Sequence, residues 1–114
     1  MLIFNLKKQW FEKIKRGEKT HEYREVKPYW TRRIANIFSD REKTFEFLNK
    51  VSGYPLFPIN NGCEFVCGYA KKDDKEKRLK AKIKSIRIIN GKSTDLAIDK
   101  DVYDISFELI KEQQ

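Results

Sequence analysis

Histidine and cysteine are scarce in this sequence, and that scarcity excludes most metal sites. The 114 residues include one histidine and two cysteines. A structural zinc ion usually needs four His or Cys ligands, so His21, Cys63 and Cys67 are too few, and no metal site is expected. If residues 63–67 are extended, the two cysteine Cα atoms lie ~13 Å apart, which is too far for a disulfide bond. Both thiols are therefore expected to be reduced, as in intracellular proteins.

Long hydrophobic runs are also missing. No stretch approaches the ~20 apolar residues that a membrane-spanning helix needs. The first ten residues, MLIFNLKKQW, lack the basic start, long apolar stretch and small-residue cleavage site of a secretory signal. The sequence therefore predicts a cytoplasmic protein with no membrane partner.

The motifs of the common cofactor enzymes are absent as well. The chain has no phosphate-binding P-loop, no glycine-rich dinucleotide motif and no serine triad, and no cofactor is expected. Positive charge, by contrast, is abundant. Lysine and arginine number 25 against 17 aspartates and glutamates, which gives a net charge of +8. Such an excess favours a polyanionic partner, although a merely solvated lysine-rich surface is the alternative.

The length predicts a single domain over residues 1–114. Hydrophobic spacing indicates a strand at residues 2–6, a helix at 7–16, a polar strand at 19–25 and a helix from Pro28. Within residues 39–60, Ser39 and Glu42 form a capping box that predicts a third helix. The second half reads as strands at residues 62–69, 79–89 and 103–109, with a shift of apolar phase that predicts a β-bulge near Ser85. The fold class is therefore α+β, with a small, curved or closed sheet of mostly antiparallel strands.

The stretch GEKTHEYRE, residues 17–25, has an unusual composition for a strand. A strand in a small protein normally has at least one apolar face to bury. Here neither face is apolar, since one carries Thr20, Glu22 and Arg24 and the other carries His21, Tyr23 and Glu25. A strand of this kind is suited to line a wet cleft.

The same stretch carries a family resemblance. Gly17, Lys19, Glu22 and Arg24 fit the G-x-K-x-x-E-x-R signature of the ASCH domain (activating-signal-cointegrator homology). The preceding strand and the helix with WFEKI also resemble this family, and the closing VYDISFEL is similar to its last strand. The resemblance covers residues 1–38 well and 62–110 loosely. Residues 39–60 then form a helical insertion.

This resemblance implies a PUA-like fold, a small β-barrel with flanking helices, and a cleft that binds RNA or a modified nucleotide within it. The residue chemistry agrees with that expectation. Arg24 offers a planar fork and Glu22 an acceptor for a base edge, and Lys19, expected in the turn before the strand, can reach a phosphate. The aromatic and basic neighbours expected to stack on bases or contact phosphates are Tyr23, Lys27, Tyr29 and Arg32. A monomer is favoured.

The resemblance also leaves an enzymatic alternative open. Some small ASCH proteins act as an amidohydrolase on N4-acetylcytidine or as a ribonuclease. Lys19 matches the lysine of the amidohydrolases, but Glu22 occupies the position of their nucleophilic threonine, where it would have to act as a general base. The third partner, a carboxylate after the long middle strand, has Asp95 and Asp99 as candidates by region. A ribonuclease would use Lys19 and Glu22, with His21 as a possible third group.

Several structural alternatives stand beside these assignments. In one alternative, Glu22 and Arg24 form an internal salt bridge at the rim of the barrel. Trp30 lies in an apolar helical stripe and is expected in the core. The lysines of residues 71–77 and 80–84 are predicted to form a positive sheet edge, which either follows phosphates or protects the edge from association.

Overall fold

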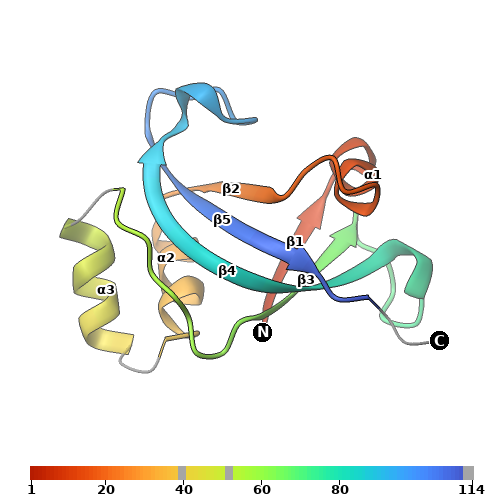
Figure 1. The fold of residues 1–114 in the computed structure, drawn as a ribbon, viewed down its shortest axis with the longest axis horizontal. Coiled ribbons are helices and arrows are strands. Elements are labelled where there is room, and N and C mark those ends of the chain that lie inside the picture. The colour runs from red at the N-terminus through yellow and green to blue at the C-terminus, as the bar shows by residue number, and fades with distance from the viewer. Residues whose placement is uncertain (39–40, 51–52, 112–114) are drawn as a thin grey trace.

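A computed structural model describes residues 1–38, 41–50 and 53–111 of the chain. Within these residues a five-stranded mixed sheet curls into a half-barrel with three α-helices around it, which confirms the α+β class (Figure 1). The elements, in chain order, are β1 (Leu2–Leu6), α1 (Lys8–Lys15), β2 (His21–Glu25), α2 (Pro28–Ala35), α3 (Arg41–Lys50), β3 (Gly62–Cys67), β4 (Arg78–Asn90) and β5 (Asp101–Leu109). Short 3₁₀ turns at Lys75–Lys77 and Gly91–Ser93 flank β4.

The sheet has the strand order β1-β3-β4-β5-β2. Only the β1–β3 pair in this sheet is parallel and the other three pairs are antiparallel, as expected of a mostly antiparallel sheet. The order leaves β1 and β2 as the two edge strands. Because the sheet is curled, these edges approach each other, and Arg24 of β2 donates a hydrogen bond to the carbonyl oxygen of Asn5 on β1 (3.1 Å).

The first two helices pack their apolar faces onto the sheet. Phe11 and Ile14 of α1 are buried, and the helix is followed by Gly17, whose φ of +78° favours glycine. Pro28 occupies the first turn of α2, where its missing N–H costs nothing. Trp30 stacks on Phe4 with ring centroids 5.2 Å apart and packs against the core, so its predicted core role is confirmed.

Strand β4 shows the predicted bulge. Ala81 and Ile83 are buried before it and Ile86 and Ile88 after it, and the register with β5 shifts between Ile83 and Ser85. The lysines at positions 80, 82 and 84 are exposed. They do not form a sheet edge, however, because β4 pairs with β3 on one side and with β5 on the other. The predicted positive edge is therefore wrong for β4, whose lysines lie on the outer face of a central strand.

Helix α3 confirms the helix expected within residues 39–60, while the predicted cap residue Ser39 lies outside the described residues. Leu48 of α3 is buried in the main core. Further along, Leu56 forms an antiparallel bridge with Ile86 of β4. Leu48 and Leu56 therefore both contact the rest of the molecule. In the part of the chain that the structure describes, no helix has the length and apolar character needed to cross a membrane.

Burial of Cys63 predicts a pH dependence of stability. Burial raises the pKa of the Cys63 thiol to about 12, with a further contribution from the Glu22 carboxylate. In the unfolded chain this thiol ionises near pH ~8.5. Above that pH the unfolded chain loses the thiol proton, whereas the folded protein keeps it up to about pH 12. The resulting stability is complete below pH ~8.5 and is lost as the pH rises towards 12.

Denaturant unfolding measured from about pH 8 to about pH 10 checks this expectation. The decline in unfolding free energy should be shallower in Cys63→Ala than in wild type, and Cys67→Ala serves as the control that keeps the wild-type slope. Equal slopes in wild type and Cys63→Ala would contradict it.

Candidate ligand-binding site

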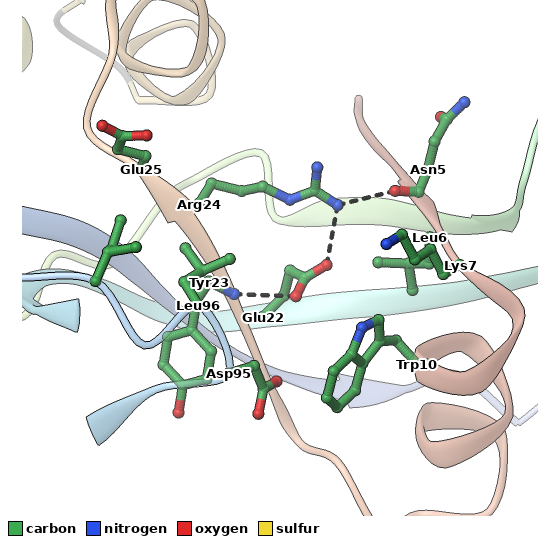
Figure 2. A pocket seen from close by; sticks show the side chains of 11 residues that line it. Asn5, Leu6, Lys7, Trp10, Glu22, Tyr23, Arg24, Glu25, Asp95 and Leu96 are labelled. Carbon is green, nitrogen blue, oxygen red and sulfur yellow. Dashed lines mark hydrogen bonds and ion pairs between the residues drawn. The ribbon is translucent and has the colours of Figure 1, made fainter. Parts of the chain in front are cut away.

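A pocket of about 430 Å³ opens beside β2. It lies between this strand, the junction of β1 with α1, and the loop that connects β4 to β5 (Figure 2). The residues that line it are Asn5, Leu6, Lys7, Trp10, Glu22, Tyr23, Arg24, Glu25, Asp95, Leu96 and Ile98. Lys19 lies beside it, against two of the lining aromatic rings.

The register of β2 explains why this strand is polar. Glu22 lies opposite Ile105 of β5 and Arg24 lies opposite Tyr103, and both partners belong to the buried core. The two charged side chains therefore point into the half-barrel, and Glu22 is only 5% exposed. A carboxylate this buried is stable only when it is paired and hydrogen-bonded.

The protein supplies those partners to both Glu22 oxygens. Oε2 accepts a hydrogen bond from Arg24 Nη2 (3.0 Å), and Oε1 accepts one from the Tyr23 backbone N–H (3.0 Å). Lys19 Nζ lies 3.6 Å from Oε1. The predicted internal ion pair of Glu22 with Arg24 is thus present, and it forms one wall of the pocket (Figure 2).

Aromatic rings hold Arg24 in place. Its guanidinium carbon lies 4.8 Å from the Trp30 ring centroid and 5.2 Å from that of Phe4. Its Nη2 makes both hydrogen bonds, to Asn5 and to Glu22. Among the described residues, Nε and Nη1 have no hydrogen-bonded acceptor, so these two donors are left for a ligand.

Lys19 occupies the turn between α1 and β2, as predicted. The turn is fixed by backbone hydrogen bonds from Glu18 and Lys19 N–H to the Lys13 carbonyl (2.9 and 3.2 Å). The Lys19 side chain is only 9% exposed and forms an ion pair with Asp95. Its ammonium also lies 5.5 Å from the Trp10 ring centroid and 5.0 Å from that of Tyr23. Two carboxylates and two aromatic rings thus fix one cation at the side of the pocket.

The β4–β5 loop owes its shape to Gly91. Its carbonyl accepts hydrogen bonds from the N–H groups of Thr94 and Ile98 (both 3.2 Å), and its own N–H donates to the Lys100 carbonyl (2.8 Å). These bonds fold the loop back on itself, which brings Asp95 to Lys19. Asp99 instead bonds to Asn90 (3.0 Å), away from the pocket.

Tyr23 keeps its proton at neutral pH. Burial raises the pKa of its hydroxyl, and the carboxylates of Asp104 and Asp95 raise it further. The half-buried phenol is therefore a neutral group at the pocket wall that can both donate and accept a hydrogen bond.

His21 lies on the outer face of the sheet, opposite in phase to Glu22 and Arg24. Its Nδ1 is 2.6 Å from Asp104 Oδ1, and Arg87 Nε donates to Asp104 Oδ2 (2.9 Å). Asp104 is 2% exposed. His21 does not line the main pocket; with Lys19, Tyr23 and Asp95 it lines a smaller hollow of about 270 Å³ next to it.

The structure brings together only some of the predicted site residues. Glu22, Tyr23 and Arg24 line the pocket with Lys19 against them, but the candidates on and before α2 do not. Lys27 forms an ion pair with Glu25 (3.1 Å), and Arg32 is exposed. Tyr29 lies in a separate hollow beside β1.

Trp10 and Asn5 line the pocket but were not predicted as site residues. Trp10 lies within the helix predicted at residues 7–16, and the helical period does not distinguish a core position from one at the margin of the core. The Asn5 carbonyl carries no signal in the sequence at all. Asp95 was one of two candidates by region, and only the folded loop distinguishes it from Asp99.

Comparison with known proteins adds no family assignment. No family model matches the chain, and the curated proteins include none that matches it. Among the described residues, no group of three or more His, Cys, Asp or Glu side chains is arranged to hold a metal ion.

Proposed function

We propose that this protein is a PUA-like ASCH domain that binds RNA and holds the base of one nucleotide, normal or modified, in the pocket beside β2. The observation that carries the proposal is the buried Glu22–Arg24 pair. Arg24 Nη2 donates to Glu22 and to the Asn5 carbonyl. Arg24 Nε and Nη1, in contrast, have no acceptor among the described residues. Fixed donors of this kind suit the acceptor atoms of a base edge.

The dimensions and surroundings of the pocket support this proposal. Pockets for small organic ligands typically have volumes of about 300–1,000 Å³, and this one has about 430 Å³. Trp10 and Tyr23 supply aromatic surface for stacking. Lys7 at the rim and the net charge of +8 favour a polyanion over a neutral metabolite.

Anisotropy of a fluorescently labelled single-stranded RNA across a salt series tests the proposal. We expect binding that weakens with salt, and Lys19→Met should weaken it at least about tenfold because a hydrogen bond or ion pair to a charged group contributes ~1.5–3 kcal/mol. Lys82→Met is the control for the loss of one positive charge, since it removes an exposed lysine from the outer face of β4. A larger loss for Lys82→Met would place the RNA on the outer face, and absence of binding by wild type would refute the proposal.

A second candidate function is hydrolysis of a modified nucleoside in the same pocket. The observation that favours it is the convergence of Lys19 with the carboxylates of Asp95 and Glu22. Both Glu22 oxygens, however, already accept hydrogen bonds from the protein. Glu22 is also only 5% exposed, and a general base must come within reach of the proton that it removes, so the geometry supports binding better than catalysis.

Glu22→Gln separates these two functions. Glutamine is nearly isosteric and still accepts a hydrogen bond from Arg24, so a binding pocket should keep its RNA affinity within about tenfold. A hydrolase should instead lose turnover and keep its affinity. N4-acetylcytidine hydrolysis, followed by liquid chromatography, and RNA anisotropy provide the two readouts. Turnover by wild type that disappears in Glu22→Gln would favour the hydrolase.

A further inference from the structure

Another hollow, of about 320 Å³, lies between β1 and α2. It is separate from the pocket beside β2, but Asn5 lines both. Its lining residues are Met1, Leu2, Ile3, Asn5, Tyr29, Arg33, Asn36, Ile37 and Asn60. The two sites are therefore neighbours along the free edge of β1.

A continuous series of cation–π and aromatic contacts connects the two sites. Arg24, at the first pocket, stacks on Trp30, and the Trp30 ring meets Tyr29 edge-on with centroids 5.1 Å apart. Tyr29 is 56% exposed, and the Arg33 guanidinium lies only 3.4 Å from its ring centroid. A hydrogen bond from Arg33 Nη1 to the Tyr29 carbonyl (3.1 Å) fixes this stack. The outer face of the guanidinium is a flat cationic surface on which a nucleobase can stack.

The hollow between β1 and α2 differs from the pocket beside β2 in the charge of its lining residues. Its lining contains one arginine and no acidic residue, and no carboxylate among the described residues forms an ion pair with Arg33. The first pocket, in contrast, has Glu22, Glu25 and Asp95 in its lining. An unbalanced positive charge favours an anionic occupant, so the phosphate of a nucleotide is better accommodated at the second site than at the first.

Polar groups that can hydrogen-bond to a base line the same hollow as Arg33. Asn36 and Asn60 are exposed and each offers amide donors and an acceptor. The backbone N–H and C=O groups of Ile3 point to the same side of β1 as those of Asn5, because the direction of these groups alternates from one residue to the next along a strand. The Asn5 carbonyl on this side already accepts from Arg24.

From this arrangement we infer that the hollow between β1 and α2 is a second nucleotide subsite, which takes the next nucleotide of a single-stranded RNA whose base occupies the first pocket. The base of that nucleotide stacks on Arg33 over Tyr29, and the intervening phosphate lies near Arg33. This inference rests on the proposed function and specifies its ligand as a strand of at least two nucleotides rather than a free nucleoside.

The test compares substitutions one residue apart on α2, with a labelled RNA hexamer of mixed sequence as the probe. Arg33→Gln and Arg32→Gln each remove one exposed arginine, but only Arg33 lines the hollow. Tyr29→Ala is compared with Tyr69→Ala, because Tyr69 is an exposed tyrosine that lines neither site. We expect Arg33→Gln and Tyr29→Ala to weaken binding at least about fivefold, since stacking contributes ~1–3 kcal/mol per base, and both controls to stay within about twofold.

The outcomes separate the two proposals. If Lys19→Met weakens hexamer binding but Arg33→Gln and Tyr29→Ala match their controls, the second subsite is refuted and the first pocket stands. If the wild-type protein does not bind the hexamer, the proposed function itself fails. Circular dichroism spectra that match wild type show that an effect of either variant arises at the surface and not from unfolding.

Discussion

Replacing Arg24 with methionine is expected to lower the free energy of unfolding by about 3 kcal/mol, because removing one partner of a buried ion pair leaves the other charge uncompensated. Methionine keeps the apolar contact with Trp30 and Phe4, so most of the loss should come from Glu22, which is 5% exposed. Lys19, at 3.6 Å from this carboxylate, compensates only in part. Chemical denaturation of both proteins measures the difference.

The double variant Glu22→Gln/Arg24→Met is the control for this explanation. It removes the buried negative charge together with its partner, so it should recover a substantial part of the lost stability. A double variant as unstable as Arg24→Met alone would show that lost packing, and not the isolated carboxylate, causes the effect.

Replacing Gly91 with alanine is expected to destabilise the protein by about 2 kcal/mol and also to weaken ligand binding. A Cβ atom at this position would lie 2.7 Å from Val102 Cγ1 and 2.9 Å from the Ile98 carbonyl oxygen, closer than such atoms can approach. Overpacking of this kind typically costs ~1–3 kcal/mol. Relief requires the loop to move, and this loop holds Asp95 against Lys19. Thermal unfolding and RNA anisotropy measure the two effects.

Gly62→Ala is the matched control for this substitution. Gly62 begins β3 and has an ordinary backbone conformation, and an added Cβ would meet no atom within 4 Å. It should unfold within about 1 kcal/mol of wild type and keep its affinity. If Gly91→Ala were as stable as Gly62→Ala and bound RNA equally well, the loop would not depend on this close approach.

Local patterns in the sequence were sufficient to predict most of the fold. The strand at residues 2–6, the helix that starts at Pro28 and the bulge beside Ser85 follow from hydrophobic period, backbone restriction and phase, which are properties of neighbouring residues. The pairing partners of β4 are set by contacts far apart in the chain. For that reason its lysines were expected at an edge, although they lie on the outer face of a central strand.

The candidate site was predictable to a similar degree. Polar residues on both faces of β2 indicated a functional strand, and Glu22 and Arg24 do line the pocket. The sequence did not predict the pairing of Asp95 with Lys19, which requires the loop geometry that Gly91 imposes. It also named Arg32 and not Arg33 as a site residue, although one residue along a helix turns a side chain by ~100° and only Arg33 of the two lines the hollow between β1 and α2.

The hydrogen bond from Arg24 to the Asn5 carbonyl also bears on self-association. Unpaired edge strands expose N–H and C=O groups that invite pairing with other chains. Here the two edges of the sheet turn towards each other, and one side chain spans the gap that a ladder of backbone hydrogen bonds would otherwise fill. A ligand that engages Arg24 therefore acts at the junction that keeps the two edges together. Under the proposed function, ligand binding at this pocket and the contact between the two sheet edges would therefore depend on the same arginine.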